Sequence, residues 1–164
     1  MPTTERGAEG CIESAKGAVL RYLEHENDTV KRRGAWERFA ALCRRTEDWT
    51  GEVHALVEIS AQEDTSFVMV SNAINRFNQI FRQQLIPQGS DERYVLGKRL
   101  TEIFEAHGED ANATDCSRMA WLCLSLHEEV RAREYTTKGL QIEPQNEYCL
   151  NLAARLNMQL PLGT

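Results

Sequence analysis

The segment from Thr114 to Pro144 constrains the fold more than any other, because its apolar residues follow a helical spacing twice, with a break between. Thr114 or Asp115 can accept hydrogen bonds from the free backbone N–H groups of a first helical turn. Pro144 ends the second run, because proline disfavours helical geometry at the residue before it. The segment therefore predicts a helix, a tight turn near His127 and Glu128, and a second helix.

Both of these predicted helices are amphipathic. The first has an apolar stripe at i, i+3, i+4, i+7 spacing, formed by Cys116, Met119, Ala120, Cys123 and Leu126. Trp121 and Leu124 lie on a second face, which must be covered or left open for a partner. In the second helix the residues expected to face inward are Ala132, Tyr135, Thr136, Gly139, Leu140 and Ile142.

Residues 114–146 resemble one tetratricopeptide repeat, a two-helix unit of about 34 residues. The residues that carry the resemblance are Ala120, Ala132, Gly139, Leu140, Ile142 and Pro144. Small residues in such a repeat let its two helices approach closely. The segment departs from the repeat pattern at Cys116 and Cys123, where aromatic residues are common, and at His127, which replaces the turn glycine. An ordinary helical hairpin followed by a proline is the alternative interpretation.

Further amphipathic helices are expected before and after this segment. Their predicted ranges are 9–25, 31–45, 51–61, 65–85, 91–107 and 147–160. The hairpin at 31–62 is weakly repeat-like, with Trp36, Phe39 and Ala40 facing inward. We expect the last helix to cap the open apolar face of the repeat, as the ends of helical solenoids require. Gly108 is expected as the C-cap of the fifth helix, and residues 1–8 and 161–164 as flexible tails.

The sum of these segments is all-α, with short connections, no strand alternation and no glycine-rich run. At 164 residues the chain fits a single domain, residues 1–164. We expect antiparallel hairpins stacked as a short α-solenoid like that of tetratricopeptide repeats. A compact, irregular helical bundle is the alternative.

Charge and composition narrow the class of partner. The net charge of −6 disfavours broad binding to nucleic acids or anionic membranes. No apolar run approaches the roughly 20 residues of a membrane span, and the N-terminal residues do not form a signal peptide. Five cysteines, an odd number mostly at apolar helical positions, suggest reduced thiols and hence a cytoplasmic protein.

We find no pattern typical of catalysis. The chain has neither glycine-rich nucleotide-binding motif, GxxxxGK[ST] or GxGxxG, and His127-Glu128 lacks the second histidine of an HExxH zinc site. Cys116 and Cys123 would lie roughly 10 Å apart along one helix, too far for one metal ion. We therefore predict no catalytic residues, no metal site and no cofactor, and hence no enzyme.

The resemblance implies a binding surface, because the first helices of successive tetratricopeptide repeats line a groove that receives a peptide or helix. It places on that groove Ser117, Arg118, Trp121, Leu124 and Ser125. The helix after Pro144 would add Tyr148, Asn151 and Arg155, and the amide-rich face of 65–85 includes Asn75 and Gln79. Trp121 is the strongest candidate anchor, with packing against the helix at 91–107 as its structural alternative.

The predicted function is thus a non-catalytic adaptor that binds a protein or peptide partner. Repeats that clamp a C-terminal carboxylate use Lys and Asn on this face, and Trp121 stands where Asn would be expected, which disfavours that specialised role. The alternatives are a self-associating regulatory subunit, such as a homodimer, a docking portion beside a catalytic protein, or an enzyme with an unrecognised site.

Overall fold

The computed structural model describes residues 4–87, 90–107 and 110–159, and every regular element in these ranges is a helix. The eight helices are α1 (Thr4–His25), α2 (Thr29–Arg45), α3 (Trp49–Ser60), α4 (Phe67–Arg82), α5 (Asp91–His107), α6 (Ala113–Ser125), α7 (Glu129–Ile142) and α8 (Glu147–Arg155). The predicted all-α class is confirmed. The predicted C-cap Gly108 and the tail at 161–164 lie outside the described residues.

Two predicted boundaries at the ends of the chain are wrong. The helix α1 begins at Thr4 rather than at residue 9, because no proline after Pro2 interrupts helical geometry there. The helix α8 ends at Arg155 rather than at 160. Asn157 has a left-handed backbone (φ 50°), and the N–H of Met158 donates to the carbonyl of Ala153 at 2.9 Å, which closes the last turn.

The same closing geometry joins the helices of two hairpins. After α2, Glu47 is left-handed (φ 55°) and the N–H of Asp48 donates to the Cys43 carbonyl at 2.9 Å. After α6, His127 is left-handed (φ 60°), and the N–H of Glu128 donates to the Cys123 carbonyl, also at 2.9 Å. This motif usually places glycine at the left-handed residue. The short turns make α2–α3 and α6–α7 antiparallel neighbours.

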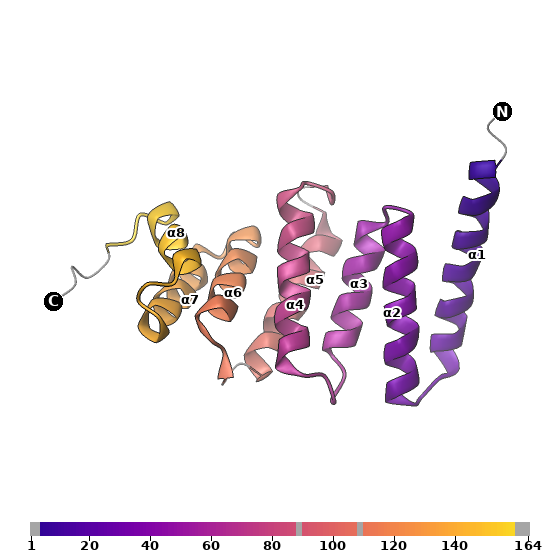
Figure 1. The fold of residues 1–164 in the computed structure, drawn as a ribbon, viewed down its shortest axis with the longest axis horizontal. Coiled ribbons are helices and arrows are strands. Elements are labelled where there is room, and N and C mark those ends of the chain that lie inside the picture. The colour runs from indigo at the N-terminus through magenta and orange to yellow at the C-terminus, as the bar shows by residue number, and fades with distance from the viewer. Residues whose placement is uncertain (1–3, 88–89, 108–109, 160–164) are drawn as a thin grey trace.

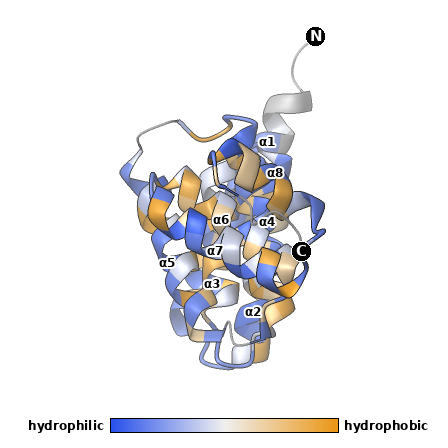
Figure 2. Cartoon of the chain, turned by 90° about the vertical axis from the view of Figure 1, so that its left-hand side faces the viewer, coloured by the Kyte–Doolittle hydropathy of each residue, from blue (hydrophilic) through white to orange (hydrophobic). Residues whose placement is uncertain are grey.

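The helices lie side by side along the longest axis of the molecule, from α1 at one end to α8 at the other (Figure 1). The helix α6 packs against α4 and α8, and α3 packs against α5, so neighbouring helices are also joined across hairpins. Viewed along the long axis, α5 lies on one side and α4 and α8 on the other, and each helix carries both hydrophilic and hydrophobic residues (Figure 2).

The main core lies between α3, α4, α5 and α6, and includes the fully buried Phe77, Phe104, Met119 and Leu122. Burying a side chain of this size stabilises a fold by about 1.5–3 kcal/mol. A second cluster joins α1, α2 and α3 around Trp36 and Phe39.

The predicted apolar stripe of the helix at 114–126 is confirmed, since all five of its side chains are buried. Gly139 lies where α7 crosses α6 and α8: a Cβ atom on it would collide with Cys149 Sγ and lie 3.3 Å from Cys116 Cβ. The prediction for Ile142 is wrong, because this last residue of α7 extends past the covered part of the helix and is 49% exposed.

Candidate partner-binding face

Two hollows open on the face that α2, α4, α6 and α8 share. The first, here called the α2–α4 groove, lies between α2 and α4 with α3 as its floor and has a volume of about 590 Å³. Its lining residues are Glu37, Ala40, Arg44, Glu52, Leu56, Ile59, Ser60, Met69, Asn72, Ala73 and Arg76. Both α2 and α4 pack against α3, but within the described residues they do not form a packed pair with each other.

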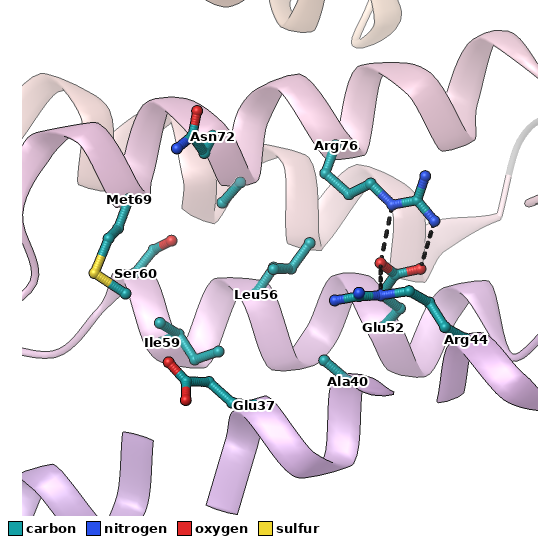
Figure 3. A pocket seen from close by; sticks show the side chains of 11 residues that line it. Glu37, Ala40, Arg44, Glu52, Leu56, Ile59, Ser60, Met69, Asn72 and Arg76 are labelled. Atoms are coloured by element: carbon teal, nitrogen blue, oxygen red, sulfur yellow. Dashed lines mark hydrogen bonds and ion pairs between the residues drawn. The ribbon is translucent and has the colours of Figure 1, made fainter. Parts of the chain in front are cut away.

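A fully buried carboxylate, Glu52 of α3, forms one end of this groove. Arg76 of α4 donates to both of its oxygens, from Nε at 2.9 Å and from Nη2 at 3.0 Å. Arg44 of α2 reaches Glu52 Oε1 from its own Nε at 2.7 Å (Figure 3). The hydrogen bonds from Arg76 raise the pKa of its guanidinium. One carboxylate therefore joins three helices.

The rest of the groove is largely apolar. Leu56 and Ile59 of α3 form the floor, and Met69 of α4 lines the end away from Glu52 (Figure 3). Ser60 is 1% exposed, and its hydroxyl has no hydrogen-bond partner in the part of the chain that the structure describes. Buried polar atoms are almost always partnered in proteins. The groove thus combines an apolar floor with one buried hydroxyl that is unpartnered among the described residues.

The second hollow, here called the Trp121 pocket, lies between α4, α6 and α8 and has a volume of about 380 Å³. It is lined by Asn75, Asn78, Arg82, Thr114, Ser117, Arg118, Trp121, Tyr148 and Asn151. The helix α4 separates the two hollows, because it supplies Ala73 and Arg76 to the groove and Asn75 and Asn78 to the pocket.

Two guanidinium groups lie against the ring of Trp121. The Cζ atom of Arg82 is 4.7 Å from the ring centroid and that of Arg155 is 5.1 Å from it. These contacts come from α4 and α8, the helices on either side of α6, and not from α5, the neighbour considered from the sequence. Neither guanidinium has a carboxylate or hydrogen-bond acceptor among the described residues.

The wall between α4 and α6 is a polar network. Arg118 Nη1 donates to Ser71 Oγ at 2.9 Å, and Ser71 Oγ in turn donates to Asp115 Oδ1 at 2.5 Å. Asn78 Nδ2 donates to the Arg118 carbonyl at 2.8 Å. Asn78 Oδ1 is buried and receives no hydrogen bond in the described ranges. This wall therefore holds one unused acceptor beside the pocket.

The structure brings together most of the residues that the sequence assigned to partner binding. Those lining the Trp121 pocket are Asn75, Ser117, Arg118, Trp121, Tyr148 and Asn151. Arg155 adjoins it through the Trp121 ring. Asn78 and Arg82, which belong to the same amide-rich face of α4 at helical spacing from Asn75, also line the pocket.

Three predicted residues lie outside both hollows. Leu124 packs half-buried against the main core. The hydroxyl of Ser125 donates a hydrogen bond to the Trp121 carbonyl of the same helix at 2.9 Å. Gln79 is exposed and accepts a hydrogen bond from Arg76 at 3.5 Å. No sequence pattern predicts the α2–α4 groove, because the groove depends on the distance between α2 and α4 in the folded chain.

The buried thiols are unsuited to nucleophilic chemistry at neutral pH. Burial raises the pKa of Cys43 and of Cys123 to about 12, and that of Cys149 to about 11. The thiolate is the reactive form of cysteine, and these side chains remain protonated. Within residues 4–87, 90–107 and 110–159, no cluster of three potential metal ligands is present.

The described helices also include none with the length and apolar character needed to cross a bilayer. Comparisons of the chain with family models, with curated proteins and with solved structures found no match. The resemblance to tetratricopeptide repeats therefore rests on this chain's own residues.

Proposed function

We propose that the chain is a non-catalytic docking protein whose antiparallel hairpins stack as a short, tetratricopeptide-like solenoid. Its binding face is the one shared by α2, α4, α6 and α8, and its ligand is a segment of a partner protein. The observation that carries this proposal is the meeting of six candidate residues, drawn from α4, α6 and α8, around one hollow, the Trp121 pocket.

Three features support the stacked arrangement. The same left-handed turn connects α2 to α3 and α6 to α7. Helices one hairpin apart pack against each other, α4 on α6 and α6 on α8. Gly139 lies at a crossing too close for any larger side chain. Close approach at a small residue is what the resemblance to the repeat implies.

The chemistry of the face suits a polypeptide ligand. The side chains of Asn75 and Asn151 can each donate and accept hydrogen bonds, as a peptide backbone does. Tyr148 is 60% exposed at the rim of the pocket and offers a large amphipathic surface. Across α4, the α2–α4 groove provides an apolar floor for a partner side chain. We also propose a reducing, cytoplasmic location, which fits the buried, protonated thiols.

Site-specific photocrosslinking tests this proposal. A benzophenone side chain at position 148 should yield discrete adducts in native lysate, identified by mass spectrometry. The matched control is position 94 on α5, where Tyr94 is similarly exposed at 48%. Adducts of equal yield at both positions, or at neither, would show that this face does not bind.

The variant Trp121→Ala should abolish those adducts while leaving helicity largely intact, because Trp121 is only partly buried. Truncating an aromatic anchor typically costs about 2 kcal/mol or more of binding energy, roughly a 30-fold loss of affinity. Loss of the circular dichroism signal would instead identify Trp121 as part of the core.

Self-association is the second candidate, and α1 favours it. This helix has α2 as its main packing partner and leaves Leu20 and Tyr22 at 39% and 45% exposure. A dimer built on α1 would cover these side chains. Size-exclusion chromatography with light scattering discriminates the two: a concentration-independent dimer favours this alternative, and a monomer rejects it.

A further inference from the structure

The Trp121 pocket is basic, although the protein as a whole is acidic. Its lining includes Arg82 and Arg118, and Arg155 lies over the same indole ring as Arg82. No Asp or Glu lines it among the described residues. Asp115 of α6 is 8% exposed, accepts a hydrogen bond from Ser71 and lies 3.8 Å from Arg118 Nη1. Arg118 is therefore paired, and within the described ranges Arg82 and Arg155 carry the unpaired charge. The net charge of the chain is −6, so this positively charged pocket differs in sign from the protein as a whole.

The two guanidinium groups at Trp121 are arranged for an anion. A cation over an indole face gains about 0.5–1 kcal/mol at an exposed site, but two cations near one ring also repel each other. A carboxylate hydrogen-bonded to either guanidinium would offset that unpaired charge. The planar N–H groups of arginine fit a carboxylate with paired hydrogen bonds, and Trp121 holds both side chains in place without using those N–H groups.

Asn78 Oδ1, the unpartnered acceptor beside the pocket, sets a second requirement for the ligand, which is an N–H group. Asn78 is 6% exposed, and its Oδ1 atom receives no hydrogen bond in the described part of the chain. A carboxylate or a phosphate diester has no N–H group to donate to it. A peptide backbone does, and an acidic peptide carries both the donor and the anion. A long polyanion such as a nucleic acid would also meet the overall negative charge of the protein.

We propose that the Trp121 pocket binds Asp or Glu side chains of an acidic segment in the partner protein, with Arg82 and Arg155 holding the carboxylates. Asn78 accepts a hydrogen bond from the backbone of the same segment. This assignment rests on the proposed docking function and names the chemistry of the ligand. Binding of such a segment weakens as salt rises, because solvent-exposed charges are screened.

Selection of a random-peptide library, displayed on phage, against the wild-type protein tests the assignment. Selected peptides should be enriched in Asp and Glu and should fail to bind Trp121→Ala. Enrichment without acidic residues would overturn the acidic assignment and leave the docking function standing. If no peptide is enriched and position 148 gives no crosslink, both proposals fail.

Fluorescence anisotropy with the best selected peptide then tests the two arginines. Arg82→Gln and Arg155→Gln should each weaken binding roughly tenfold, the effect of losing one charge-assisted contact. Replacing Asp and Glu in the peptide by Asn and Gln should have at least that effect. The control is Arg133→Gln on α7, which removes the same charge from a cation paired with Glu129 and should change affinity less than about twofold.

Three results would overturn the assignment at this stage. Arg82→Gln and Arg155→Gln could bind as tightly as the control, or the amide peptide could bind as tightly as the acidic one. A random single-stranded oligonucleotide could bind more tightly than the acidic peptide and lose that binding in both arginine variants, which would make the ligand a nucleic acid.

Discussion

The hairpins α2–α3 and α6–α7 are built on the same turn, yet they meet the next helix along the chain differently. Asp48 N–H donates to the Cys43 carbonyl in the first hairpin, as Glu128 N–H does to the Cys123 carbonyl in the second. The helix α8 packs on both α6 and α7. The helix α4 packs on α3 but leaves the α2–α4 groove open against α2.

One buried position distinguishes the two hairpins. The residue four places after the turn is Glu52 in α3 and Ala132 in α7, and both are fully buried. Ala132 needs no partner, so its helix can pack closely. Glu52 requires cations, which Arg44 and Arg76 supply from α2 and α4. One turn geometry can therefore support either a close helix crossing, as at Ala132 and Gly139, or an ion-paired junction beside a groove, as at Glu52.

We expect the largest effect from Ala132→Glu, which places a carboxylate in α7 without the arginines that Glu52 has. An uncompensated buried charge costs about 3–5 kcal/mol, so we expect the midpoint of urea unfolding, followed by far-UV circular dichroism, to fall sharply. Ala132→Leu adds volume without charge and is the control. If both variants lose the same stability, crowding and not charge is responsible.

The reverse change, Glu52→Ala, removes the carboxylate from the ion-paired junction. Arg44 and Arg76 are 52% and 30% exposed, so they can turn to water, and we expect a loss of about 2 kcal/mol in the same urea experiment. Glu52→Gln keeps the shape and should show how much of this loss depends on charge. An unchanged midpoint in both variants would mean that the junction contributes no net stability.

Gly139→Ala tests the close crossing of α7 with α6 and α8, since the equivalent position in α3 holds the larger Ile59. The added Cβ would collide with Cys149 Sγ, and overpacking typically costs about 1–3 kcal/mol. The control is Gly34→Ala in α2, where nothing lies within 4 Å, and it should stabilise by roughly 0.5–1 kcal/mol. Differential scanning calorimetry should show opposite shifts in Tm; shifts of the same sign would contradict the close crossing.

The smallest expected effect concerns the turn carboxylate Asp48. Burial alone would raise its pKa, but hydrogen bonds from Lys16 and from the backbone N–H of Gly51 hold that pKa below its usual value. The stabilisation is therefore present at neutral pH and is lost as pH falls through the lowered pKa. Asp48→Asn keeps an N-cap acceptor but loses the ion pair.

We expect urea unfolding at pH 7 to show a stability loss of about 1 kcal/mol or less for Asp48→Asn. The difference from the wild-type protein should shrink as the pH falls below the ordinary pKa of aspartate and through the lowered pKa of Asp48, where the wild-type carboxylate also becomes protonated. A difference that is constant from neutral to acid pH would show that the ion pair with Lys16 is not its cause.

Local patterns predicted the helices well and the lining of the Trp121 pocket in part. The stripe from Cys116 to Leu126 is buried because i, i+3, i+4 spacing places these side chains on one side of any helix. The end of α8 was missed, because Asn157 adopts a left-handed turn that its sequence context does not require. Ser125 and Gln79 were predicted to bind a partner, but they line neither hollow. They share a helix face with pocket residues, and that face is wider than the pocket.

The all-helical class, the turn near His127 and the burial of Gly139 can be predicted from local sequence, because they depend mainly on residues close together in the chain. The distance between α2 and α4, and the meeting of Glu52 with two arginines from different helices, are set by how the helices pack in the folded chain. The same packing brings Arg82 and Arg155 to one indole ring. Such arrangements depend on packing between distant segments, which no local periodicity encodes.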